Sequence, residues 1–259
     1  MLARISPASA PITTPASRRG YAVAMSATVR FEVRGPLAII TLDDPPTRNA
    51  LGPETADQLA AFARQVALDD DVRLVALTGA NGVFCSGAAI RDWEQLPDAG
   101  ATLTDRGTAL CDLLEQLPVP VVALLGGHAV GGGAELALAA DWRIVAPAAQ
   151  LRFVHAGFGL IPGFGGLARL ELLVGRSRAL RYLASRASVS ADEAVTVGLA
   201  DEVVAADEQV AWAVAAAEQL QGADRGAVAA IKHALATGDE RSAFLHVWPD
   251  RRLPDRLGS

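Results

Sequence analysis

Hydrophobic and polar residues alternate along the first regular segment of the chain, which begins after residue 27. Val29, Phe31 and Val33 are separated by polar residues, and this period of two is typical of a half-buried strand. A turn at Gly35-Pro36 separates them from a second apolar run over residues 37–42. The pattern therefore predicts a β-hairpin.

Beyond a proline-rich loop, apolar runs alternate with helical periods. Helical spacing predicts one helix that begins near Pro53 and another between about Thr102 and Gln116. Apolar runs predict strands at residues 72–77, 119–125 and 142–145. From Leu167 onward the pattern is helical, with a capping box at Ser190 and Glu193. Such alternation indicates an α/β fold with a largely parallel sheet and helices layered over it.

Two loops rich in small residues follow predicted strands, which is where α/β folds bind ligands. The first spans Phe84 to Ile90 and the second spans Gly126 to Gly133. Three consecutive glycines in the second loop allow a ligand to approach the backbone and leave N–H groups at the next helix start to face negative charge. Glu135 is the only ionisable residue at that helix start. A tight turn, with Glu135 interacting with the helix dipole, explains these residues equally well.

The composition excludes several classes of protein. With 259 residues, 51% of them hydrophobic and 20% charged, the chain can bury a sizeable core in one large domain or two smaller ones. A net charge of -6 argues against a nucleic-acid binder, which needs a basic face. Cys85 and Cys111 are the only cysteines, so no disulfide framework or Cys-x-x-Cys metal site is expected and the cytoplasm is favoured. No apolar stretch reaches the roughly 18 residues of a membrane span.

Two other patterns suggest ligand sites that we do not favour. Asp69-Asp70-Asp71 lies where a helix passes into a strand, and acidic residues at such corners are usually just solvated, so no metal site is expected. Gly163, Gly165 and Ala168 have the spacing of a dinucleotide fingerprint, but Pro162 rather than a strand precedes them. Nicotinamide binding is therefore rejected.

Residues 1–26 differ from the rest of the chain. They carry several arginines, prolines and small residues and no acidic residue. An organellar transit peptide has this bias, but the prolines interrupt the amphipathic helix that such a peptide requires. We therefore expect a disordered N-terminal extension over residues 1–26.

Six separated blocks occur in the order typical of one family. They are Arg48 to Leu51, Leu77 to Gly79, Phe84 to Ala88, Gly131 to Ala137 with Asp141, Gly159 to Gly166, and Ala194 to Val204. Over roughly residues 29–232 the chain thus resembles the enoyl-CoA hydratase/isomerase (crotonase) family. The resemblance implies a crotonase-like α/β spiral of ββα turns over residues 27–200, a C-terminal helical region over residues 201–259, and a homotrimer or hexamer. It also implies acyl-CoA substrates and no separate cofactor, because CoA is part of the substrate.

The resemblance also assigns roles to both small-residue loops. It implies that the backbone N–H groups of Ala88 and Gly132 form an oxyanion hole, which stabilises the charge that develops on a thioester oxygen as an enolate forms. It further implies a CoA channel lined by Arg48, Ala50, Ser86, Ala89 and Ile90. In this channel Arg48 is available to contact a phosphate. Arg48 is equally well interpreted as an ordinary surface arginine.

Two residues, Glu135 and His155, are candidates for acid–base catalysis. The family's hydratases use two glutamates, of which the first matches Glu135 and the second matches His155, seven residues before Pro162. A histidine exchanges protons near neutral pH and so can replace a carboxylate. Alternatively, the change ends hydration in favour of another reaction, or His155 is structural. Ala89 stands where the family commonly has aspartate, which puts the cap of the following helix in doubt.

Three functional hypotheses are compatible with these residues. The favoured one is a lyase of hydratase/isomerase type in which Glu135 and His155 share the proton transfers. The second is another reaction of the family, such as decarboxylation or hydrolysis of a thioester or C–C bond. The third is an acyl-CoA-binding accessory subunit without turnover, against which Glu135 argues. His128, beside the glycines, either faces the acyl pocket or is a structural histidine, and the second is commoner for a lone histidine.

Overall fold

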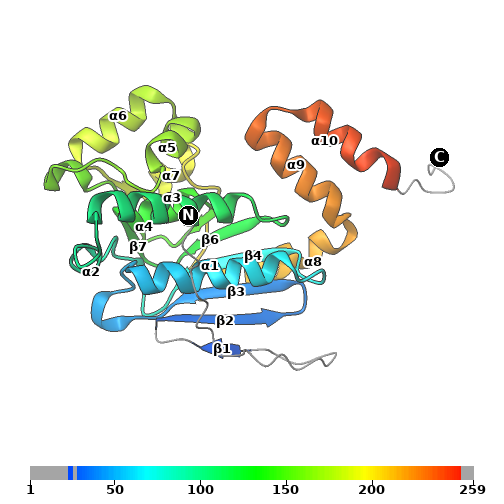
Figure 1. Ribbon diagram of the computed structural model, residues 1–259, viewed down its shortest axis with the longest axis horizontal. Coiled ribbons are helices and arrows are strands. Elements are labelled where there is room, and N and C mark those ends of the chain that lie inside the picture. The colour runs from blue at the N-terminus through cyan, green and yellow to red at the C-terminus, as the bar shows by residue number, and fades with distance from the viewer. Residues whose placement is uncertain (1–22, 26–27, 252–259) are drawn as a thin grey trace, which may run out of the picture.

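The computed structural model describes residues 23–25 and 28–251, which form two sheets with helices packed around them (Figure 1). The larger sheet has seven strands, in the spatial order β1 (Val23–Met25), β2 (Val29–Arg34), β3 (Leu37–Leu42), β4 (Leu74–Gly79), β6 (Val121–Leu125), β8 (Trp142–Val145) and β11 (Glu202–Val203). From β3 to β11 neighbouring strands are parallel, and β1 and β2 pair antiparallel. The predicted hairpin and the largely parallel sheet are confirmed.

A smaller sheet contains β10 (Ser188–Ser190), β9 (Gln150–Arg152), β7 (His128–Val130) and β5 (Val83–Cys85), in that order. β7 lies inside the segment that the sequence predicts to be a plain turn between a strand and a helix. It pairs parallel with both β5 and β9, and this pairing places the ends of the two small-residue loops at one edge of the sheet.

Helices cover both faces of the larger sheet. They are α1 (Pro53–Ala67), α2 (Ile90–Trp93), α3 (Ala99–Glu115), α4 (Gly132–Leu138), α5 (Gly166–Val174), α6 (Arg176–Ser185), α7 (Ala191–Thr196), α8 (Gln209–Gln219), α9 (Arg225–Thr237) and α10 (Glu240–Val247), with short 3-10 turns η1 (Pro45–Thr47), η2 (His155–Phe158), η3 (Leu220–Gly222) and η4 (Trp248–Asp250). The predicted cap of α7 is confirmed, since the Ser190 hydroxyl accepts a hydrogen bond from the Glu193 N–H at 3.3 Å.

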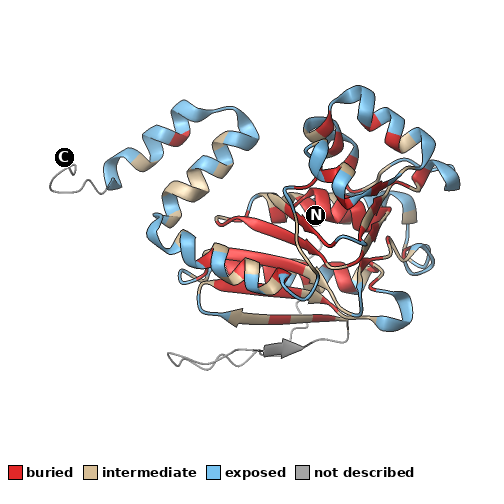
Figure 2. Cartoon of the chain, turned by 180° about the vertical axis from the view of Figure 1, so that it is seen from behind, coloured by how far each residue is buried: buried red, intermediate tan, exposed pale blue. Residues whose placement is uncertain are grey.

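Strand β3 shows why the central strands read as continuous apolar runs. Ala38 and Ile40 face the main core, whereas Leu37 and Ile39 face the other side. There α8 packs Ala213 against the sheet. Because successive side chains point to opposite faces, a strand covered on both faces needs apolar residues at every position. Figure 2 shows this burial concentrated in the sheet and in α4.

The first described residues belong to the larger sheet, whereas the last helices lie beside the body of the molecule. Most of the expected extension, residues 1–22 and residue 26, lies outside the described residues, but Val23–Met25 pair with β2 and so form ordered sheet. At the other end α9 and α10 form a hairpin beside the body of the molecule (Figure 1). Among the described residues, no helix has the length and apolar composition needed to cross a bilayer.

Candidate functional site

The two small-residue loops bring the backbones of Ala88 and Gly132 together. A Cβ atom added to Gly132 would lie 3.3 Å from the Ala88 nitrogen. Gly132 is the first residue of α4, so its N–H has no partner within the helix. In the described part of the chain, the Ala88 carbonyl accepts from the Ile90 N–H at 2.9 Å, whereas no backbone hydrogen bond uses the Ala88 N–H. Two backbone donors therefore lie side by side where the sequence predicts an oxyanion hole.

The turn before Gly132 explains the run of glycines. Gly131 has φ 52° and ψ −120°, a conformation that residues with a Cβ rarely adopt. Its N–H donates to the carbonyl of Arg152 at 2.9 Å, which fixes the turn to β9. The glycine run thus lets the chain leave β7 and begin α4 at Gly132, close to Ala88.

The predicted CoA-binding residues lie on two loops that are joined along their backbones. The Ser86 N–H donates to the Arg48 carbonyl at 3.1 Å, and the Ser86 hydroxyl donates to the Thr47 carbonyl at 2.8 Å. Leu51, next to Ala50, forms a parallel bridge with Ala88. Ala89 caps α2 without a side-chain hydrogen bond, as its lack of a polar group predicts. Arg48 and Ile90 are exposed, so these loops offer a solvent-facing edge beside the two donors.

Asn49 lies in the stretch from Arg48 to Ala50 that the resemblance places along the CoA channel, and it organises the same loops through its side chain. It is buried, and its amide nitrogen donates to the carbonyls of Ala80 and Val83 at 3.0 and 2.7 Å. Its side-chain oxygen accepts from the Asp44 N–H at 2.9 Å. The backbone has φ 63°, which asparagine tolerates better than most residues. An asparagine in a proline-rich turn was the available signal for such a contact.

Glu135 is almost fully buried and accepts hydrogen bonds on both oxygens. Oε2 accepts from the N–H groups of Phe164 and Gly166 at 2.7 and 3.0 Å, and Oε1 accepts from the Gly163 N–H at 3.1 Å. The carboxylate therefore closes the loop before α5 by binding three of its backbone donors. Gly166 has to be a glycine, because a Cβ there would lie 2.5 Å from the Glu135 Cγ.

His155 completes the contacts of Glu135. Its Nε2 lies 3.0 Å from Oε1 of Glu135, so the structure brings together the two acid–base candidates from elements 20 residues apart. His155 begins η2 and is 9% exposed. Its Nδ1 is buried without a hydrogen-bond partner among the described residues. The pair thus combines a carboxylate whose two oxygens are both occupied with a ring nitrogen that has no partner in the described residues.

Arg169 holds the same loop from the opposite side. Its Nη1 donates to the Phe164 carbonyl at 2.7 Å, while its Nε and Nη2 donate to Glu115 and Asp112 of α3 at 2.7 and 2.6 Å. Burial by itself lowers the pKa of Arg169, but its bonds to these carboxylates raise it above the ordinary value. The loop at Phe164 is thus fixed to α4 through its N–H and to α3 through its carbonyl.

His128 has a different hydrogen-bond partner from the Glu135–His155 pair. Its Nε2 is 3.0 Å from Nη2 of Arg152, which also binds the Gln150 side chain. Burial, followed by the charges of Arg152 and Arg48, lowers the pKa of His128. A neutral histidine that accepts from an arginine fits the structural interpretation.

Neither cysteine has the environment of a nucleophile. Both are free thiols buried in the core. Burial raises the pKa of Cys85 to about 12 and also raises the pKa of Cys111. Since the thiolate is the reactive form, these residues are inert packing groups.

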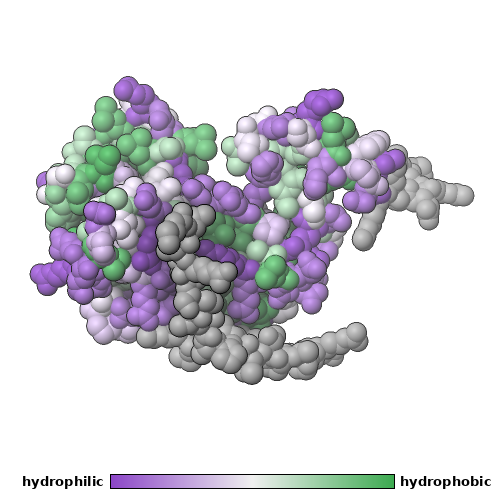
Figure 3. All heavy atoms as spheres, viewed as in Figure 1, coloured by the Kyte–Doolittle hydropathy of each residue, from purple (hydrophilic) through white to green (hydrophobic). Residues whose placement is uncertain are grey.

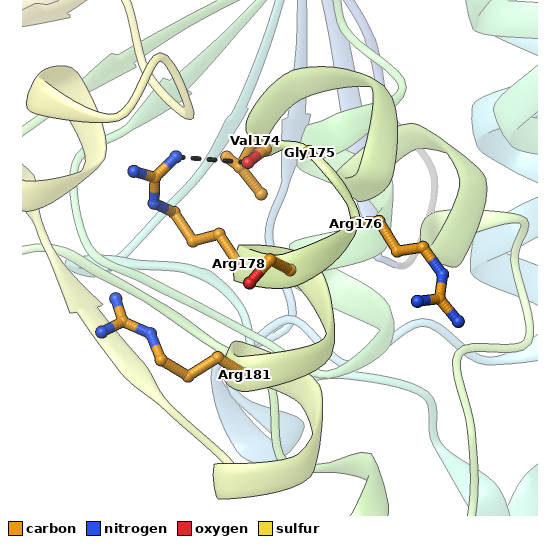
Figure 4. Close-up of a pocket in the computed structure, with 6 residues that line it drawn as sticks. Val174, Gly175, Arg176, Arg178 and Arg181 are labelled. Carbon is orange, nitrogen blue, oxygen red and sulfur yellow. Dashed lines mark hydrogen bonds between the residues drawn. The ribbon is translucent and has the colours of Figure 1, made fainter.

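A separate cavity lies at the start of α6 (Figure 4). It has a volume of about 490 Å³ and is lined by Val174, Gly175, Arg176, Ser177, Arg178 and Arg181. The side chain of Arg176 points away from those of Arg178 and Arg181, and the Arg178 guanidinium already donates to the Val174 carbonyl at 3.2 Å. The three charges do not converge on one point, so we do not assign a ligand to this cavity.

Comparisons with known proteins agree with this arrangement. The enoyl-CoA hydratase/isomerase family profile matches residues 32–247. A Bacillus subtilis relative named for that family, YngF, is 37% identical over 187 residues, which are 70% of this chain and 71% of the relative. The ethylmalonyl-CoA decarboxylase of Danio rerio is 32% identical over 230 residues, covering 82% of this chain and 76% of that protein.

A solved structure supports the fold directly. The enoyl-CoA hydratase of Bacillus anthracis superposes with a TM-score of 0.77 at 28% identity, covering 93% of this chain and all of the other. The crotonase fold implied by the six sequence blocks is thereby confirmed. The chain belongs to the enoyl-CoA hydratase/isomerase family.

Proposed function

We propose that the protein is a hydratase/isomerase-type enzyme that forms an enolate of an acyl-CoA thioester. The N–H groups of Ala88 and Gly132 hold the thioester oxygen, and His155 exchanges the proton while Glu135 positions it. The observation that carries the proposal is the 3.0 Å contact between His155 Nε2 and Glu135 Oε1, with Nε2 3.9 Å from the position of a Cβ added to Gly131, the residue before Gly132. Fixed donors at an enolate oxygen stabilise the transition state more than the bound thioester.

The hydrogen bonds of Glu135 support this division of roles. Three backbone N–H groups and His155 already occupy its oxygens. When Nε2 of His155 carries the hydrogen and donates to Glu135, Nδ1 has a free lone pair and is the base. For hydration, Nδ1 takes a proton from water as the water oxygen bonds to the β-carbon, and the electron pair moves to the thioester oxygen. Return of a proton to the α-carbon completes the addition, and no further cofactor takes part.

Decarboxylation is the second candidate. Loss of carbon dioxide from an α-carboxyl thioester gives the same enolate, which then needs one proton donor rather than a pair of acid–base groups. A single ring nitrogen without a partner, in His155, fits that need. The similarity to a relative named as a decarboxylase also supports it.

The test is hydration of crotonyl-CoA, followed by absorbance of the enoyl thioester. We expect turnover by the wild type, and a fall of about 10² to 10⁴ in kcat for His155→Ala, because a general base is lost. Glu135→Gln should lower kcat and shift its pH profile, which loss of a merely structural contact would not do. His233→Ala, an exposed histidine in α9, is the matched control and should match the wild type.

Three results would contradict parts of the proposal. Full activity of His155→Ala removes His155 as the proton carrier. A silent wild type with an active His155→Glu variant shows that the scaffold supports hydration but that this chain performs another reaction, and α-carboxyl thioesters are then the substrates to test. Binding of butyryl-CoA without any turnover in either assay favours the accessory-subunit hypothesis.

We also propose that several copies assemble, as the family resemblance implies. Large apolar side chains are exposed on α5 and α6, including Leu172 and Leu180, and on the α9–α10 hairpin, including Leu235 and Phe244. Figure 3 shows a broad apolar patch over α5 and α6 and a smaller one on the α9–α10 hairpin. A second copy of the chain is the occupant we propose for these faces, and sedimentation equilibrium should give a multiple of 26.8 kDa. A monomer at all concentrations would overturn this.

A further inference from the structure

The side chain of Phe164 lies against the two backbone donors. A Cβ atom added to Gly132 would lie 2.7 Å from Cε2 and 3.3 Å from Cζ of the Phe164 ring, and 3.3 Å from the Ala88 nitrogen. The ring and the Ala88 N–H therefore flank the same point. The ring is thus packed directly behind the backbone at which a group bound through its oxygen to the N–H groups of Ala88 and Gly132 would lie.

The ring occupies a space that two glycines leave open. On the side opposite Gly132 is Gly107 of α3, where an added Cβ would lie 2.0 Å from Cδ1 of Phe164. The ring is 1% exposed. Phe164 thus fills the gap between α3 and α4 next to the donors, and any side chain at either glycine would displace it.

The backbone of Phe164 prevents the ring from withdrawing. Its N–H donates to Glu135 Oε2 at 2.7 Å, and its carbonyl accepts from Arg169 Nη1 at 2.7 Å. Arg169 is in turn bound to Glu115 and Asp112 of α3. Moving the ring aside by moving its backbone would break contacts to buried charged groups, which are among the stronger hydrogen bonds in proteins.

We propose that Phe164 sets the size of the acyl group and limits the substrates to thioesters with short acyl chains. The inference rests on the proposed function, because the thioester oxygen must bind at Ala88 and Gly132 for its acyl chain to meet the ring. A short chain ends before the volume that the ring occupies. A long chain requires the volume that the ring fills between α3 and α4.

The experiment compares binding of butyryl-CoA and octanoyl-CoA by calorimetry in the wild type, Phe164→Leu and Phe164→Ala. The wild type should bind butyryl-CoA at least about 10-fold more tightly, since even one methylene changes selectivity in an apolar pocket by roughly 10- to 200-fold. Phe164→Ala should reverse or abolish the preference, and Phe164→Leu should be intermediate. The matched control is Phe62→Ala, which removes a buried ring stacked on Phe31 at 5.0 Å and should keep the wild-type preference.

The outcomes separate this inference from the proposed function. If the wild type binds both thioesters equally, or if Phe164→Ala weakens both alike, Phe164 does not set acyl size although the protein still binds acyl-CoA. If the wild type binds neither thioester, the acyl-CoA function falls and the inference falls with it. Circular dichroism establishes that each variant is folded, and Phe164→Leu, which keeps an apolar core group, carries the test if Phe164→Ala does not fold.

Discussion

The loops around Glu135 and the α9–α10 hairpin are attached to the body of the protein in opposite ways. Around Glu135, buried side chains bind backbone groups of distant segments, as Asn49 does 31 and 34 residues away. In the described chain, α9 has no buried residue and α10 has one, Ala243. Figure 2 shows the hairpin as exposed and intermediate residues with almost no buried ones. The site is therefore part of the cooperative core, whereas the hairpin is a separable element.

Two charged side chains hold the hairpin. Lys232, the only lysine in the sequence, contacts Asp141 at 2.6 Å and donates to the carbonyls of Leu114 and Val119. Arg225 binds the end of α1 through the carbonyl of Ala67 at 3.1 Å. Burial lowers the pKa of Lys232, although Asp141 opposes the shift. A few polar contacts therefore attach the hairpin to the protein, whereas apolar packing holds the other elements together.

The largest expected effect comes from adding one methyl group in the site region. Gly166→Ala places a Cβ 2.5 Å from Cγ and 2.7 Å from Oε2 of Glu135. Since Glu135 is held by three N–H groups of one loop and by His155, it cannot move away freely. We expect a loss of about 2 to 3 kcal/mol in the free energy of unfolding, typical of overpacking, together with most of the activity. Urea unfolding and the crotonyl-CoA assay measure the two losses.

The same substitution in the C-terminal region is the control. A Cβ on Gly222 meets no atom within 4 Å, so Gly222→Ala should leave stability unchanged or raise it slightly. Equal destabilisation by the two variants would show that the site and the C-terminal region are not packed differently.

A smaller effect is expected from releasing the hairpin. Lys232→Met keeps the apolar stem but removes the ammonium group that Asp141 and two carbonyls share. The loss should be about 1 to 2 kcal/mol, because the hairpin can lift and let water reach the unpaired groups. Hydrogen exchange should accelerate across α9 and α10 and remain slow in α4.

Faster exchange in α4 as well would mean that the hairpin unfolds only with the core. Unchanged exchange in α9 would mean that packing, rather than the Lys232 contacts, holds it. Lys232→Arg retains a positive charge and is the conservative control, which should protect α9 better than the methionine variant.

Local patterns in the sequence predicted much of the fold. Val29, Phe31 and Val33 have the strand period, and Leu59, Phe62 and Val66 have the helical period, so β2 and α1 could be placed from them. β7 was missed because three residues beside glycines carry no period of their own. Its pairing with β5 and β9, which lie elsewhere in the chain, defines it as a strand.

The family resemblance assigned roles to Glu135, His155 and both backbone donors, but it gave none of their contacts. The bonds from Glu135 to the N–H groups at Gly163, Phe164 and Gly166 span 28 to 31 residues and depend on the loop conformation. No sequence period records a side chain that binds a distant backbone, so the anchoring role of Glu135 and the clamp at Arg169 required the structure.

The smallest effect concerns pH and reports on the site region alone. The pKa of His128 is lowered below 6.5 by burial and by the charges of Arg152 and Arg48. Below about pH 6.5 the unfolded chain therefore binds a proton that the folded chain resists, and the free energy of unfolding falls as the pH falls. His128→Gln keeps an acceptor for Arg152 but does not titrate. Its unfolding free energy, measured by urea titration from pH 7.5 to 5, should decline less than that of the wild type, and parallel curves would exclude His128 as the source. The hydrogen-bond partner of His128 is Arg152 rather than a residue of the α9–α10 hairpin, so the protection of α9, corrected for the intrinsic effect of pH on exchange, should not follow this dependence.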